Sequence, residues 1–183
     1  MGSLKIPLNY GSLAGMVAFA AFLFYYFVLG QNPLGDVSWL SSIIPIIFVY
    51  LGVKKYRDEE REGYIDFGFA FTAGLLISFT YATLFAMLVY LFGWSISSEF
   101  VDMHINESIE ALEKVEELTR SLLGDDNFEE DYENTYKDNY NNIINSTAGI
   151  IVWGDARVKM MGGAIVSLIV AAIVKKKQSP IAD

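Results

Sequence analysis

The chain has 183 residues, of which 53% are hydrophobic and 19% are charged, and its net charge is −9. The negative charge argues against a nucleic-acid-binding protein, because contacts to phosphates require a basic surface. The absence of cysteine excludes disulfides and thiolate chemistry, and the single histidine, His104, excludes metal sites built from several histidines; we expect no metal site and no cofactor.

The first 53 residues contain two long runs without charged residues. Residues 8–29 form the first run, 22 residues or about 33 Å as a helix, which is enough to cross the hydrocarbon core of a bilayer. Residues 37–53 form a second run of 17 residues that contains Pro45. Both runs predict transmembrane helices. The alternative, a buried helix of a soluble protein, is weakest for the first run, because soluble helices are rarely apolar on every face for six turns.

Residues 67–92 predict a third span, which is long enough to cross a membrane with tilt. The fourth apolar run covers only residues 160–174, and a full span counted back from Val174 begins at Asp155. The fourth span is therefore predicted over residues 155–174.

Three charged residues, Asp155, Arg157 and Lys159, stand at the outer end of this predicted fourth span. Asp155 and Lys159 are four residues apart with the acid first, an order that favours an ion pair on a helix. By helical rise the three residues lie about 22–29 Å from the other end of the span, so we expect their side chains to reach the lipid headgroups. The alternative is a transport role, because charges deep in a bilayer usually mark an ion path.

Eight of the 13 basic residues lie on one side of the predicted spans. They precede span one, separate spans two and three, and follow span four: Lys5, Lys54, Lys55, Arg57, Arg61 and Lys175–Lys177. Loops rich in Lys and Arg face the cytoplasm, so both termini and the loop 54–66 are predicted to be cytoplasmic. Fifteen of the 22 acidic residues lie between Glu99 and Asp155, and the acidic segment 94–150 is predicted to lie outside.

This acidic segment has the pattern of two amphipathic helices. An apolar stripe in its first part is formed by Ile105, Ile109, Leu112, Val115, Leu118 and Leu122. An aromatic row then recurs at every fourth residue: Phe128, Tyr132, Tyr136 and Tyr140. We predict a helical hairpin over residues 99–145, with Leu112, Leu118 and Phe128 facing inward. The tyrosine row has two interpretations, packing against the first helix or a docking face for a partner.

Small residues recur at helical spacing in three of the predicted spans. They are Gly11 and Gly15 in span one, Ala70, Gly74, Ser78 and Ala82 in span three, and Gly163, Ser167 and Ala171 in span four. Lipid tails provide no hydrophobic drive for helix association, so helices in membranes pack through close contact of such residues. We expect these rows to pack within the bundle; the alternative is an interface with another protein.

Three short motifs at the ends of the predicted spans carry a family resemblance. They are Asn9-Tyr10-Gly11, Leu51-Gly52-Val53-Lys54-Lys55 and Gly63-Tyr64-Ile65-Asp66-Phe67-Gly68. With the acidic insert and the basic tail, the chain resembles over nearly its whole length a bacterial family of four-span membrane proteins catalogued as domain of unknown function 4199. Asp66 and Phe69 stand where the family pattern has Ser and Glu, which puts any carboxylate role there in doubt. The resemblance implies no established activity.

The sequence as a whole predicts an all-α integral membrane bundle of four transmembrane helices with an extramembrane helical hairpin between spans three and four. Its segments are residues 1–93, 94–150 and 151–183. No nucleophile motif, catalytic triad or phosphate-binding loop is present. We therefore predict a non-catalytic accessory or scaffold subunit of the bacterial cytoplasmic membrane, beside a larger membrane partner or a second copy. The alternative is a small transporter or lipid-handling protein.

Overall fold

The computed structural model describes residues 4–35, 39–123 and 131–176, and the regular structure in these ranges is helical apart from one isolated bridge between Ile65 and Lys176. The elements are, in chain order, α1 (Lys5–Phe24) with a π-helical continuation η1 (Tyr25–Leu29), α2 (Trp39–Glu60), α3 (Phe67–Ser95), α4 (Glu99–Leu123), α5 (Asp131–Ile144) and α6 (Ala148–Val174). The predicted all-α fold class is confirmed.

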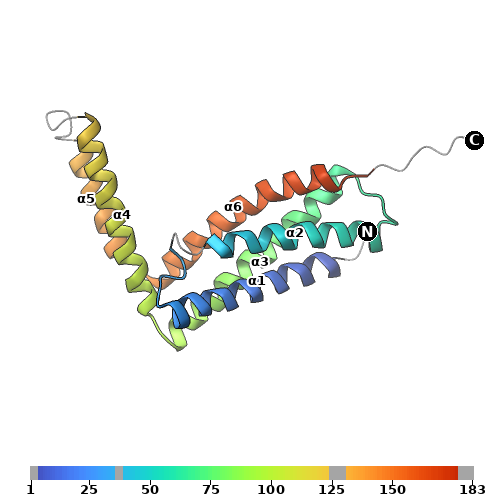
Figure 1. Cartoon of the computed structure of the whole chain (residues 1–183), viewed down its shortest axis with the longest axis horizontal. Coiled ribbons are helices and arrows are strands. Elements are labelled where there is room, and N and C mark those ends of the chain that lie inside the picture. The colour runs from blue at the N-terminus through green and yellow to red at the C-terminus, as the bar shows by residue number, and fades with distance from the viewer. Residues whose placement is uncertain (1–3, 36–38, 124–130, 177–183) are drawn as a thin grey trace, which may run out of the picture.

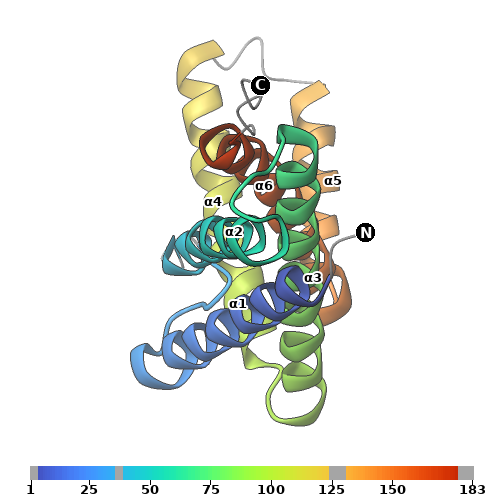
Figure 2. The ribbon, with the colours of Figure 1, turned by 90° about the vertical axis from the view of Figure 1, so that its right-hand side faces the viewer.

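Four helices, α1, α2, α3 and α6, form a bundle in which α3 contacts each of the other three (Figure 1). The remaining two, α4 and α5, contact each other at one end of the bundle and run crosswise to it (Figures 1 and 2). The opposite end of the bundle holds the start of α1, the turn between α2 and α3, and the end of α6 (Figure 1).

Three helical stretches are long and apolar enough to cross a membrane: Lys5–Leu29, Phe67–Ser95 and Ala148–Val174. They indicate a membrane-embedded protein. Within the described residues, α2 is not among these stretches, although it covers most of the predicted second span. Its last two turns, residues 54–60, consist almost entirely of charged residues.

Two helices extend seven residues beyond their predicted ends. α6 begins at Ala148 and not at Asp155, because the Thr147 side chain accepts a hydrogen bond from the backbone N–H of Ile150 at 3.4 Å and caps the helix there. The prediction counted residues back from the other end of the span and missed this cap. α2 continues past Val53 to Glu60, because Lys, Arg and Glu are good helix formers whatever their polarity.

The crosswise pair is anchored to the bundle at the first turn of α4. The Phe100 side chain is fully buried, and its ring centre lies 5.5 Å from that of Phe22 on α1 and 6.3 Å from that of Phe92 on α3. The Tyr26 hydroxyl of η1 donates a hydrogen bond to Glu99 Oε2 at 2.9 Å. Apolar contacts and a hydrogen bond together hold the root of α4 against the bundle.

Candidate functional site

The small residues of α3 and α6 face each other inside the bundle. A Cβ atom added at Gly163 would lie 2.5 Å from Ser78 Cβ, and one added at Gly74 would lie 2.9 Å from Ser167 Cβ. Ser167 Oγ donates a hydrogen bond to the Gly163 carbonyl oxygen at 2.6 Å. The other small residues of the two predicted rows are buried as well: Ala70, Ala82 and Ala171.

The glycines of α1 face α3 in the same way. A Cβ atom added at Gly11 would lie 2.6 Å from Thr80 Cβ and 2.7 Å from the backbone oxygen of Ile77. One added at Gly15 would lie 3.2 Å from Leu84 Cβ. The three rows therefore lie between helices of this chain, where close backbone approach provides the packing.

Asp155 and Lys159 form the ion pair on α6 that their spacing predicts, and both side chains are largely buried in the protein. Their side chains are only 20% and 13% exposed, and Lys159 Nζ lies 5.0 Å from the centre of the Phe85 ring of α3. Because α6 begins at Ala148, the pair lies about two to three turns inside the helix. Arg157 lies on the exposed side of α6.

A cavity of about 380 Å³ lies where α4, α5 and α6 meet the loop that follows η1. Its walls are partly apolar and partly polar, and they include Leu34, His104, Ser108, Ile143, Ile150 and Asp155. The cavity thus brings the single histidine of the chain to the same place as the acid of the α6 ion pair. Sequence reasoning missed this site, because His104 belongs to no recognisable motif and the loop is far from its partners in the sequence.

The loop after η1 is fastened to α4 by Asn32. The Asn32 side-chain nitrogen donates to Glu107 Oε2, and its Oδ1 accepts from the backbone N–H of Leu34 at 3.0 Å. Gly35 lies directly against the Glu107 carboxylate, and a Cβ atom there would lie 2.1 Å from Oε2. The sequence signal for this contact is the Asn-Pro-Leu-Gly turn at 32–35, whose partner 72 or more residues away is not apparent from the sequence.

His104 lies half-buried at this junction. Burial lowers the pKa of His104, and the nearby carboxylates of Glu107 and Asp155 oppose the shift. The Asn32 side-chain nitrogen lies 3.4 Å from His104 Nδ1. An amide nitrogen can only donate, so Nδ1 is the acceptor and the neutral ring carries its proton on Nε2.

Lowering the pH from about 7 to about 5.5 is expected to destabilise the wild-type protein more than the His104→Gln variant. The ordinary histidine pKa is about 6.5, and the folded-state pKa of His104 lies below it. The unfolded chain therefore binds the proton first, and stability present above about pH 6.5 is lost as the pH falls toward the folded-state pKa. Thermal unfolding of both proteins in detergent over a pH series measures the difference. Equal shifts of the two midpoints would show that another group is responsible.

The apolar stripe of α4 is covered only near the bundle. Leu112 is half-buried, but Val115, Leu118 and Leu122 are 59%, 60% and 75% exposed. The prediction that Leu118 faces inward is therefore wrong. Phe128, its predicted partner, lies outside the described residues. The reason for the exposure is the composition of α5, in which Ile143 and Ile144 are the only aliphatic side chains.

α4 and α5 also do not pack closely against each other along the apolar stripe of α4. A groove of about 400 Å³ runs between α4 and α5, and its walls include Ala111, Leu112, Val115, Asn142 and Ile143. By helical spacing, Leu118 and Leu122 continue the same face of α4 beyond the groove. We call Val115, Leu118 and Leu122 the distal stripe.

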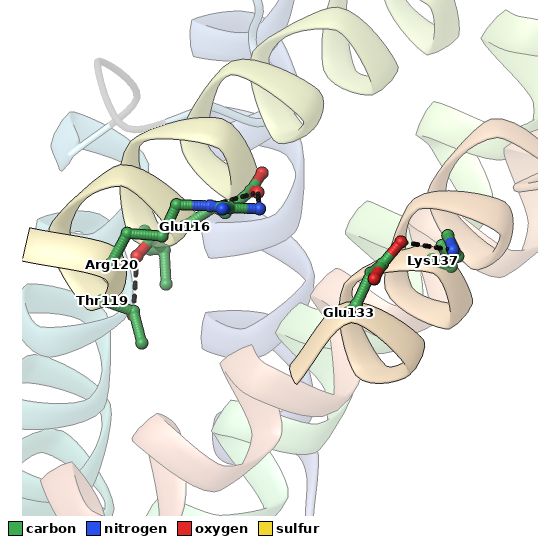
Figure 3. A network of polar contacts seen from close by, with 6 residues as sticks. Glu116, Thr119, Arg120, Glu133 and Lys137 are labelled. Atoms are coloured by element: carbon green, nitrogen blue, oxygen red, sulfur yellow. Dashed lines mark hydrogen bonds and ion pairs between the residues drawn. The ribbon is translucent and has the colours of Figure 1, made fainter. Parts of the chain in front are cut away.

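Ion pairs within each helix lie in the part of the α4–α5 pair that is far from the bundle (Figure 3). Arg120 binds Glu116 on α4 at 2.8 Å, and Lys137 binds Glu133 on α5 at 2.6 Å. The hydrogen bond from Lys137 lowers the pKa of Glu133, and the charge of Arg120 across the pair adds to this effect. Such exposed pairs stabilise a helix only slightly. Among the described residues, α5 has no aliphatic side chain besides Ile143 and Ile144 to cover the distal stripe.

The tyrosine row is divided between the two interpretations. Tyr136 is half-buried beside α4, where desolvation and the carboxylates of Glu116 and Glu113 raise its pKa. Tyr140 stacks on Tyr136 with ring centres 6.4 Å apart, yet Tyr140 and Tyr132 are both exposed. Packing against α4 thus accounts for Tyr136 and leaves Tyr132 and Tyr140 at the surface.

Among the described residues, no group of three or more His, Asp or Glu side chains is arranged to hold a metal ion.

Comparison with known proteins identifies the family of the chain. No curated protein and no solved structure matches the chain. The family model described as "Protein of unknown function (DUF4199)" matches residues 9–176. This match covers nearly the whole chain and confirms the resemblance seen in the motifs: the chain belongs to the DUF4199 family.

Proposed function

We propose that the chain is a four-span protein of the bacterial cytoplasmic membrane that serves as an accessory or scaffold subunit and has no catalytic activity of its own. In this proposal α2 supplies the fourth span, since it packs on α1, α3 and α6 and carries no charge over residues 39–53. The basic residues at the α2–α3 turn and near both termini support a cytoplasmic location for that end of the bundle. The pair α4–α5 then lies outside.

The observation that carries the proposed role is the exposed distal stripe. Burying a Leu or Val side chain stabilises a protein by about 1.5–3 kcal/mol, so leaving three of them in water is unfavourable unless a partner covers them. Acidic side chains surround the stripe on α4 and α5. They favour a partner with basic residues around an apolar surface, and they disfavour contact with anionic lipid.

Labelling with a membrane-impermeant thiol reagent is expected to place Glu59 and Glu113 on opposite sides of the membrane. Both residues are exposed, and the chain has no cysteine of its own. Each is replaced by cysteine in turn, and labelling is measured in intact cells and again after the membrane is opened. We expect Glu113→Cys to react in intact cells and Glu59→Cys only after opening. Labelling of both from the same side would contradict the four-span topology.

Native mass spectrometry after mild detergent extraction from native membranes tests the accessory role. We expect a stoichiometric complex with another membrane protein or a second copy, and we expect Leu118→Ser with Leu122→Ser to abolish it. Because both side chains are exposed, these changes leave the fold intact.

The matched control is Glu113→Ser with Glu117→Ser, which changes two exposed side chains of α4 at the same spacing. The control is expected to weaken the complex far less than loss of the distal stripe does. A complex that survives loss of the distal stripe would contradict docking through it. A protein that carries only a bound small molecule would favour the transporter or lipid-handling alternative.

A further inference from the structure

Arg61 has a buried guanidinium N–H, whereas two basic residues before it in α2 form ion pairs. Arg57 is paired with Asp58 at 2.7 Å and Lys55 with Glu59 at 3.6 Å. Arg61 lies over two aromatic rings: its Cζ is 3.8 Å from the centre of the Phe69 ring and 5.8 Å from that of the Tyr56 ring. Its Nε atom is buried and has no hydrogen-bond acceptor among the described residues.

The backbone after Arg61 makes an unusual turn. Glu62 has a φ of 53°, which side-chain-bearing residues rarely adopt, and Gly63 follows with a φ of 81°. The Tyr64 N–H closes the turn on the Arg61 carbonyl at 2.9 Å. Such conformations cost free energy and often occur where a side chain must be aimed. Here the turn at residues 61–64 reverses the direction of the chain, so that Arg61 lies over Phe69 at the start of α3.

Arg61 stands at an apolar cavity of about 270 Å³ between the start of α1, the end of α2 and the first turns of α3. The other wall residues include Leu4, Pro7, Tyr56, Phe69, Thr72 and Leu76. Leu4, Phe69 and Thr72 are exposed on the outside of the bundle. The cavity therefore opens sideways, to the surroundings of the bundle.

We infer that this cavity binds an anionic phospholipid, with the phosphate at Arg61 and the upper part of an acyl chain along the apolar walls. A guanidinium with a buried, unpartnered N–H provides a charge-assisted donor for a phosphate oxygen. The lateral opening and apolar walls suit a lipid chain, and Arg61 lies near the end of the bundle, at the level of headgroups. The inference rests on the proposed membrane topology and is independent of the partner at the distal stripe.

Native mass spectrometry of the purified protein, titrated with phosphatidylglycerol or phosphatidylcholine, tests this inference. We expect the wild-type protein to bind phosphatidylglycerol more tightly than phosphatidylcholine. Arg61→Gln is expected to lower the phosphatidylglycerol affinity by about tenfold, since a hydrogen bond to a charged group is worth about that much. Lys54→Gln, which removes an exposed charge from the same end, is expected to have a clearly smaller effect.

Thr72→Phe distinguishes a lipid from free phosphate. The added ring would fill the cavity and leave Arg61 in place, so phosphatidylglycerol binding should fall although the charge remains. Binding of inorganic phosphate as tight as that of the lipid, and unaffected by Thr72→Phe, would overturn the lipid assignment. Equal phosphatidylglycerol affinity of Arg61→Gln and wild type, with both folded by thermal unfolding, would overturn the site. The partner complex at the distal stripe is expected to persist in Arg61→Gln, so the two proposals fail separately.

Discussion

Alanine at Gly163 is expected to destabilise the bundle, whereas alanine at the adjacent Gly162 is expected to stabilise it slightly. The new Cβ at Gly163 would lie 2.5 Å from Ser78 Cβ, an atom fixed to the α3 backbone, so the two helices must move apart. Overpacking of this kind costs about 1–3 kcal/mol. At Gly162 nothing lies within 4 Å, and replacing a helical glycine by alanine contributes about 0.5–1 kcal/mol.

Thermal unfolding in detergent compares the two variants directly, since they differ by one position on the same helix. The midpoint should fall for Gly163→Ala and stay equal or rise for Gly162→Ala. If the two changes have the same effect, close packing of α3 on α6 does not hold the bundle together.

Leucine at Asp155 is expected to destabilise the protein by about 2 kcal/mol, whereas leucine at both Asp155 and Lys159 restores most of this loss. Removing one member of a buried ion pair costs about 3–5 kcal/mol, because the other charge is left without compensation. We expect less here, because the two side chains are 20% and 13% exposed and water screens them in part. Replacing both charges removes the unpaired ammonium beside Phe85 and leaves an apolar contact.

Arg157→Leu provides the control for this pair, because Arg157 is on the exposed side of the same helix. Its effect on the unfolding midpoint should be small. A double variant that loses as much stability as the sum of the two single variants would show that Asp155 and Lys159 act independently.

The elements that could be predicted from the sequence are those with a local signal. The uncharged runs at 8–29 and 67–92 led to α1 with η1 and to α3, because a helix that must satisfy its own backbone in lipid needs such length and composition. The start of α6 depends on the cap at Thr147, which the length of the apolar run does not reveal.

The junction and the distal stripe depend on contacts that no local pattern contains. Asn32 and Glu107 are 75 residues apart, and neither belongs to a motif that predicts their contact. The stripe on α4 was expected to be buried because amphipathic helices usually pair through their apolar faces. That expectation failed at Leu118, since α5 offers tyrosines and asparagines where aliphatic side chains are needed.

The buried Phe100 at the root of α4 sets a distance between the bundle and anything that touches the distal stripe. Val115 and Leu122 are 15 and 22 residues further along the helix, or about 22–33 Å at 1.5 Å per residue. That is two to three helix diameters, and α4 runs crosswise to the bundle (Figure 1). A membrane protein bound at the distal stripe would be separated from the bundle in the plane of the membrane. Lipid could then diffuse between the two proteins. The hairpin would then act as a strut that spaces two membrane proteins, and lengthening α4 by whole turns would widen the spacing by about 5.4 Å each.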